Sequence, residues 1–130
     1  MKYTEIFRLK KMLEEANIPF QFIDRTINYP ELNIYREHYQ ICYPKFNSTE
    51  DMNKPAEFVC SCIEGRGTYG SDFDLLEIMG LLTDKELKYD SVAGGLTADD
   101  VFNRIKKHYC EVVGNTYDNP ELLEGDDAKD

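Results

Sequence analysis

The sequence predicts an α+β domain with an N-terminal helix, a three-stranded antiparallel sheet and two to three C-terminal helices packed on one face. Apolar residues recur at helical spacing near the start of the chain and again in its second half. Between these parts lie three short runs of aromatic, β-branched and cysteine residues. The loops that join the runs are too short for crossover helices, which favours antiparallel pairing and this fold class.

The first expected element is a helix from Thr4 to about Asn17. Thr4 is a favourable N-cap residue, and Pro19 ends the helix because the residue before a proline avoids the helical conformation. Charged side chains occupy one side of this helix. The other side carries Ile6, Leu9, Met12, Leu13 and Ala16.

Three strands are expected next, at residues 20–24, 39–43 and 57–64. The last run is apolar or small between its two glutamates, which favours a buried strand. Residues 26–38 show no clear pattern and stay unassigned, whereas residues 44–55 have the composition of a polar loop.

The remainder is expected to be helical. Residues 71–74 resemble a capping box with Asp in place of Glu, and Leu75, Leu76, Met79 and Leu82 follow on one helical face. Residues 83–86 form a full capping box that begins a short helix. The glycine pair at residues 94–95 interrupts the chain.

A last helix is expected after residues 97–100, which resemble a further cap. Its apolar residues are Val101, Phe102, Ile105, Tyr109 and Val112. The segment 114–130 carries six acidic residues and one basic residue without periodicity, and is predicted to be a disordered acidic tail. The 130-residue chain is therefore interpreted as one α+β domain over residues 1–113, followed by this tail.

Nothing in the chain predicts export or membrane insertion. Charges interrupt the first ten residues, so they do not form a signal peptide, and no run approaches 18 apolar residues. We therefore expect a cytoplasmic protein. In a reducing compartment Cys42, Cys60, Cys62 and Cys110 are expected to be buried core residues.

Two other interpretations of the cysteines stay open, namely a metal site and redox use. A metal site would combine them with His38 and His108, but the chain contains no C-x-x-C pair, and His108 and Cys110 point in different directions on a helix. We therefore predict no metal and no cofactor.

The net charge of −10 disfavours direct binding to nucleic acid or to an anionic membrane, because phosphates repel such a surface. The charge is concentrated in residues 71–100, which hold eight acidic residues and two basic ones. Solubility alone explains an acidic surface, and complementarity to a basic partner is the alternative.

No catalytic motif is recognised, so the chain is not expected to be an enzyme. Gly65-Arg-Gly67-Thr-Tyr-Gly70 matches G-x-G-x-x-G only superficially, because no βαβ pattern surrounds it. Arg66 on this turn is a candidate contact for a phosphate or a partner. The carboxylates at the expected helix starts are explained by capping.

Tyrosines form a second candidate surface. Four of them lie within residues 29–43, and Tyr39 and Tyr43 share one strand face. Such rings suit protein binding or stacking on a nucleotide, and they also serve to cover a core.

Three motifs together resemble a family of small proteins carried by phages and mobile elements of gut Gram-positive bacteria. They are Tyr39-Gln-Ile-Cys-Tyr-Pro44, Leu75-Leu-Glu-Ile-Met-Gly-Leu-Leu-Thr83 and Leu96-Thr-Ala-Asp-Asp-Val-Phe-Asn-Arg-Ile105, and the likeness covers most of residues 1–109. The resemblance implies a genetic setting in a bacterial host cell and transfers no site residues. Small acidic proteins from this setting include anti-defence factors, among them anti-CRISPR proteins that imitate nucleic acid.

The favoured hypothesis is a non-enzymatic, anti-CRISPR-like inhibitor that occupies the basic nucleic-acid-binding surface of a host defence complex. The alternatives are an oligomeric sponge that holds a nucleotide signal between tyrosines, with Arg66 or Arg104 on its phosphate, and an accessory regulatory protein of the element. Homo-oligomerisation is compatible with each. The predicted partner-binding residues are Asp72, Asp74, Glu77, Asp84, Glu86, Tyr39, Tyr43 and Arg66.

Overall fold

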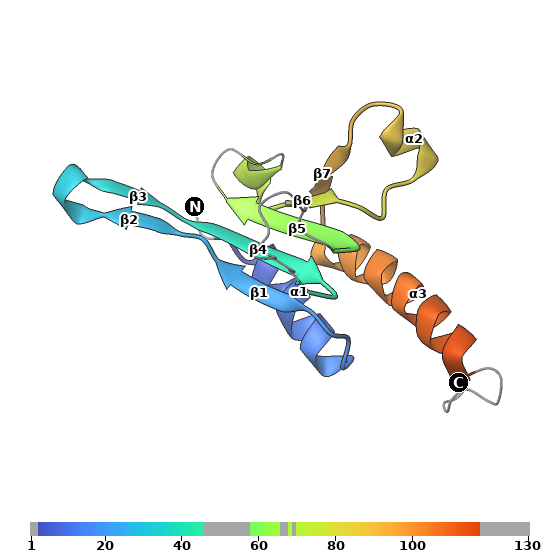
Figure 1. Ribbon diagram of the computed structural model, residues 1–130. Helices are drawn as coiled ribbons and strands as arrows, with labels where there is room; N and C mark the ends of the chain where they lie inside the picture. The colour runs from blue at the N-terminus through green and yellow to red at the C-terminus, as the bar shows by residue number, and fades with distance from the viewer. Residues whose placement is uncertain (1–2, 46–57, 66–67, 69, 118–130) are drawn as a thin grey trace, which may run out of the picture.

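A computed structural model describes residues 3–45, 58–65, 68 and 70–117 of the chain (Figure 1). The described residues form a five-stranded antiparallel sheet, a separate two-stranded sheet and three α-helices. The strands are β1 Gln21–Asp24, β2 Ile27–Tyr29, β3 Ile34–Arg36, β4 His38–Tyr43, β5 Cys60–Gly65, β6 Leu76–Met79 and β7 Val92–Leu96. The helices are α1 Glu5–Glu15, α2 Asp84–Leu87 and α3 Ala98–Tyr117, with short 3₁₀ turns η1 Pro30–Leu32 and η2 Ser71–Phe73.

The predicted three-stranded sheet is wrong, because the sheet has five strands in the order β1-β4-β5-β6-β7. Every neighbouring pair is antiparallel. The register aligns one apolar residue from each strand in a row: Phe22, Ile41, Cys62, Ile78 and Ala93. The two additional strands come from the segment that was expected to be helical.

Residues 76–79 form a strand, although Leu75, Leu76, Met79 and Leu82 also match a helical spacing. Leu76 and Ile78 are buried and alternate with the less buried Glu77 and Met79, which is the period of a strand. Asp74 (φ 55°) and Gly80 (φ 91°), on either side of this strand, have positive φ angles, and this conformation does not continue a helix. The glycine pair of residues 94–95 lies within β7 instead of ending an element.

Helices α1 and α3 cover one face of the five-stranded sheet (Figure 1). Ile6, Leu9 and Leu13 of α1 are fully buried, and Val101 and Ile105 of α3 are buried with them. These side chains meet the inward-facing residues of β4, β5 and β6, so the core lies between the helix pair and the sheet. The predicted spacing of apolar residues in both helices is confirmed at these positions.

One boundary of the C-terminal helices is confirmed and another differs from expectation. The capping box at residues 83–86 is confirmed and begins α2, which spans only four residues. Helix α3 continues to Tyr117, beyond the predicted end of the domain at residue 113. Most of the predicted polar loop and residues 118–130 of the predicted tail lie outside the described residues.

The unassigned region 26–38 forms a β-hairpin, which we call the arm. Strands β2 and β3 pair with each other and η1 closes their tip, where Asn33 adopts a left-handed conformation (φ 55°). The arm extends away from the five-stranded sheet beyond β1 and β4 (Figure 1). Among the described residues, no helix is long and apolar enough to cross a lipid bilayer.

Candidate binding surface

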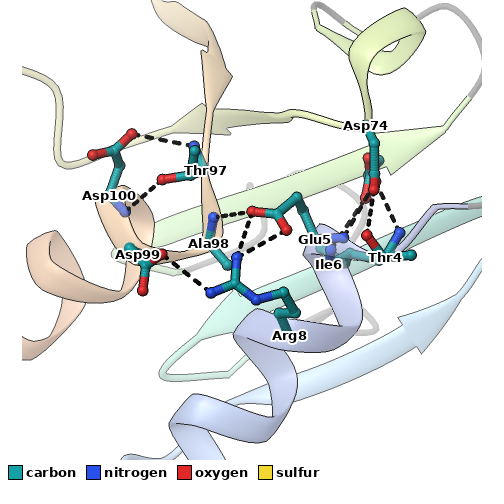
Figure 2. A network of polar contacts seen from close by, with 10 residues as sticks. Thr4, Glu5, Ile6, Arg8, Asp74, Thr97, Ala98, Asp99 and Asp100 are labelled. Carbon is teal, nitrogen blue, oxygen red and sulfur yellow. Dashed lines mark hydrogen bonds and ion pairs between the residues drawn. The ribbon is translucent and has the colours of Figure 1, made fainter.

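The N-termini of α1 and α3 lie side by side and are joined by polar contacts (Figure 2). The side chain of Glu5, the first residue of α1, accepts a hydrogen bond of 2.8 Å from the backbone N–H of Ala98, the first residue of α3. Arg8 contacts the carboxylates of both Glu5 (2.9 Å) and Asp99 (3.1 Å). A carboxylate at a helix N-terminus interacts favourably with the helix dipole, so these contacts stabilise both helix starts.

Asp74 caps α1 from another part of the chain. Its Oδ1 accepts hydrogen bonds from the backbone N–H groups of Thr4 (2.8 Å) and Glu5 (3.2 Å), and its Oδ2 accepts one from the Thr4 hydroxyl. The side chain of Thr4 makes no capping hydrogen bond to the helix backbone. The cap that was predicted for a helix at residues 71–82 therefore belongs to α1.

Glu64, at the end of β5, places a fully buried carboxyl group beside this cap. It is 0% exposed, and its Oε1 accepts a hydrogen bond of 3.1 Å from the backbone N–H of Ile6. Burial and the adjacent Asp74 raise the pKa of Glu64 to about 8. Its Oε2 receives no hydrogen bond from the described residues, so protonated Glu64 is the natural donor to Asp74.

The two carboxyl groups therefore share one proton near neutral pH. Partial burial opposes ionisation of Asp74, but hydrogen bonds from Glu64 and from Thr4 and Glu5 outweigh it and lower the pKa of Asp74. Ionised Asp74 caps α1, and protonated Glu64 supports it from the interior.

Carboxylates surround the paired helix starts, and we call this surface the acidic edge. Asp72, Asp99 and Asp100 are exposed, while Asp100 and Thr97 form a reciprocal cap at the start of α3. Figure 2 shows Glu5 and Asp99 at the Arg8 guanidinium, Asp74 at Thr4 and Asp100 at Thr97. The acidic edge consists of Glu5, Asp72, Asp74, Asp99 and Asp100.

Asp84 and Glu86 lie in α2, at the other end of β7 from the acidic edge. The five residues of β7 span about 17 Å at the usual rise of a strand, so the acidic residues 72–100 form two groups. Asp84 is exposed. Glu86 makes a two-point ion pair with Arg104 (2.7 and 2.8 Å), and this contact, together with the capping bonds to Thr83, lowers the pKa of Glu86 to about 2.

Glu77 lies on β6 between the buried residues Leu76 and Ile78, and it pairs across the sheet with Ile63. It belongs to neither acidic group. Arg66 lies outside the described residues.

Tyr39 and Tyr43 point into the core instead of forming a surface. The Tyr39 ring packs against Phe7 and Phe22, with centroid distances of 4.9 and 6.0 Å, and its hydroxyl donates to Glu37 (2.7 Å). The Tyr43 hydroxyl contacts His108 Nδ1 at 2.7 Å. Burial raises the pKa of both tyrosines to about 12. Both rings therefore belong to the core, which was the alternative to a role in binding.

A cavity of about 490 Å³ lies between the α2 region and α3. Its charged lining is mixed, because Arg104 and Lys107 are accompanied by Asp84 and Glu111. Arg104 is already engaged by Glu86 and by the Leu81 carbonyl (3.0 Å). The cavity therefore offers little uncompensated positive charge to a phosphate.

Three of the four cysteines are buried, as predicted: Cys42, Cys60 and Cys62. Cys110 is exposed on α3, which corrects the expectation for that residue. Burial raises the pKa of the Cys60 thiol to about 12. Within the described ranges, no group of three or more His, Cys, Asp or Glu side chains has the arrangement of a metal site.

The position of Glu64 within its predicted strand already indicated that its carboxyl group is buried. In a strand, alternate residues share a face, so Glu64 had to lie on the same face as Cys60 and Cys62. A carboxyl group on the buried face of an otherwise apolar strand requires a partner or a raised pKa. The structure supplies both.

Neither a protein-family model, nor a curated protein, nor a solved structure matches this chain.

Proposed function

We propose that this chain is a non-enzymatic binding protein that inhibits a host defence complex by occupying its basic nucleic-acid-binding surface. The observation that carries the proposal is the acidic edge, where five carboxylates accompany the guanidinium of Arg8. Three of these carboxylates, on Asp72, Asp99 and Asp100, are exposed. A basic groove that holds backbone phosphates attracts such a group of negative charges.

The rigidity of the acidic edge supports this role. Four of its carboxylates, those of Glu5, Asp74, Asp99 and Asp100, lie at the starts of α1 and α3, and Glu5 joins the two helix ends. Side chains already held by caps lose less conformational entropy on binding than those of a flexible segment. The proposed partner is a basic protein surface in the cytoplasm of a bacterial host cell, and the charge of −10 disfavours nucleic acid as a direct partner.

Glu64, whose carboxyl group lies beside the acidic edge and has a raised pKa, suits a structural role better than catalysis. Glu64 is fully buried, and one of its oxygens is occupied by the Ile6 N–H group. A general acid must reach a substrate atom within hydrogen-bond distance, which a sealed side chain does not.

The geometry gives less support to a nucleotide sponge. That alternative uses tyrosines of residues 29–43 as stacking platforms and Arg66 or Arg104 for a phosphate. The rings of Tyr39 and Tyr43 are in the core, whereas Tyr29 and Tyr35 are exposed. Arg104 is already paired with Glu86, and Arg66 lies outside the described residues. No particular contact favours the third hypothesis, an accessory regulator.

The test is capture of partners from a lysate of a gut Gram-positive bacterium that carries a CRISPR system. Asp72→Lys/Asp99→Lys reverses two exposed residues of the acidic edge, and the surface ion pair that it removes, between Arg8 and Asp99, contributes little stability. We expect the wild type to retain a nucleic-acid-binding protein that the double variant loses, with the difference shrinking as salt rises.

The matched control is Glu15→Lys/Glu111→Lys. It makes the same change in net charge at exposed positions away from the helix starts. Equal capture by the acidic-edge variant and the wild type, or capture that excess DNA or RNA leaves unchanged, would refute the proposal. A loss of capture in both double variants would show that bulk charge, and not the acidic edge, is responsible.

A further inference from the structure

The arm is unusually apolar for an element with so little cover. None of the residues of β2, η1 and β3 is buried. Ten large hydrophobic side chains are exposed in the described part of the chain, and four of them lie within residues 27–35. These four are Ile27 (43% exposed), Tyr29 (54%), Leu32 (68%) and Tyr35 (60%).

An isolated two-stranded hairpin is only marginally stable in water, and it needs additional packing to persist. The strand register shows which side chains of the arm are available for that packing. Ile27 pairs with Arg36, and Tyr29 pairs with Ile34. Cross-strand partners share a face, so Ile27, Tyr29, Ile34 and Arg36 form one apolar face with an arginine at its base, whereas Tyr35, which pairs with Asn28, lies on the opposite face.

Charge restricts what can cover this face. The whole chain carries −10, whereas residues 25–36 contain two arginines and one glutamate. The basic partner proposed for the acidic edge is not attracted to such a segment. Two copies of this acidic chain repel each other over most of their surface, and the arm is where they approach with least repulsion.

We infer that the arm binds the arm of a second copy of this chain. The two arms pack face to face in opposite directions about a two-fold axis, so that each apolar face covers its own equivalent. Glu31 lies at the tip and Arg36 at the base, one strand apart or about 10 Å at the usual rise. Opposite directions therefore place the Glu31 of each copy beside the Arg36 of the other.

Sedimentation velocity over a range of protein concentrations tests this arrangement. The wild type should form a dimer, and Ile27→Ser/Tyr29→Ser, which changes two exposed residues of the apolar face, should shift it to monomer at the same concentration. The control is Tyr89→Ser/Leu87→Ser, which removes two exposed hydrophobic side chains near α2 and should leave the dimer intact. Far-ultraviolet circular dichroism confirms that each variant keeps the core, which the arm does not enter.

A charge exchange tests the direction of the two arms. Glu31→Arg and Arg36→Glu should each weaken the dimer about tenfold, because each places like charges together twice. The double variant restores opposite charges and should recover affinity. Bulk repulsion predicts otherwise for Glu31→Arg, since a less negative chain should associate more strongly.

Two results would overturn the inference: a wild type that stays monomeric at the highest soluble concentration, or a dimer that persists when two exposed residues of the apolar face are replaced by serine. A dimer that the double exchange fails to restore would contradict the opposed orientation. These variants leave the acidic edge unchanged, so failure here is distinguishable from failure of the proposed function.

Discussion

Glu64 makes stability depend on pH in the direction opposite to that of an ordinary ion-paired carboxyl group. Its pKa rises from 4.5 to about 8 on folding, because burial and Asp74 disfavour the charged form. Between these pH values the folded state binds more protons than the unfolded state. The contribution of Glu64 is therefore complete below about pH 4.5 and is lost as the pH rises towards 8.

Replacing Glu64 by glutamine should remove this dependence. The amide accepts the Ile6 N–H bond, donates to Asp74, and does not ionise. We expect Glu64→Gln to flatten the stability profile between pH 5 and 8 and to be more stable than the wild type at pH 8 by about 3 kcal/mol. Urea unfolding midpoints at several pH values measure the effect. Glu15→Gln, on an exposed residue, should leave the slope unchanged, and a slope that survives in Glu64→Gln would contradict the assignment.

Gly80 is required for a steric reason that can be separated from its backbone conformation. Both Gly80 and Gly95 have positive φ (91° and 72°), which strains any other residue. A Cβ atom at Gly80 would lie 2.1 Å from the carbonyl oxygen of Val59, whereas one at Gly95 meets no atom within 4 Å. Glycine is therefore required at position 80 because the backbone of Val59, just before β5, approaches so closely.

Alanine substitution at the two glycines should therefore give unequal losses. Gly95→Ala pays only for its conformation, about 1 kcal/mol, whereas Gly80→Ala must also displace the start of β5 and should lose several kcal/mol. Thermal or urea unfolding of the two variants measures the difference. Equal losses would mean that the backbone near Val59 moves away easily.

At the scale of elements, α1 depends on a side chain that comes from a distant part of the chain. Asp74 lies 70 residues from Thr4, yet it accepts the first hydrogen bonds of that helix. Asp74→Ala should destabilise the protein by about 1–2 kcal/mol, the usual range for loss of a helix cap. Urea unfolding measures it. Asp72→Ala, two residues away and exposed, should cost less than about 0.5 kcal/mol, and equal losses would show that Asp74 acts through general charge instead of capping.

Sequence patterns identified α1, α3, β4 and β5, because the apolar residues of each element fit only one spacing, helical or alternating, and the ends of each element are marked in the sequence. They failed at residues 75–82, where Leu75, Leu76, Met79 and Leu82 satisfy a helical spacing while Leu76 and Ile78 satisfy alternation. Tertiary structure decides such a case, because β5 is central and buried and requires a hydrogen-bonding partner on both sides. That requirement lies outside the segment itself.

The candidate site was predictable only in its general character. The concentration of acidic residues in residues 71–100 was evident from composition, but not which carboxylates are used internally. Asp74 and Glu86 hold α1 and Arg104, whereas Asp72 and Asp84 face solvent. Acidic residues look alike in a sequence. The packing of the elements decides which of them form internal caps and ion pairs and which face solvent.

For the whole molecule, the two proposed interfaces should respond oppositely to salt. Binding at the acidic edge depends on attraction between opposite charges and weakens as screening increases. Association through the arm joins two chains of charge −10 by an apolar face, so screening reduces their repulsion and strengthens the dimer. One salt titration that follows both processes therefore separates them.

The contacts at the start of α1 also set an order of events during protein synthesis. Helix α1 is synthesised before the residues that complete its N-terminus, because Glu64 follows Ile6 by 58 residues and Asp74 follows Thr4 by 70 residues. Its packing partner α3 is synthesised later still. A helix of 11 residues has little stability alone, so its apolar face stays open to solvent and chaperones until these segments have been made. Helix α1 is thus stabilised only after Glu64, Asp74 and α3 have been added to the chain.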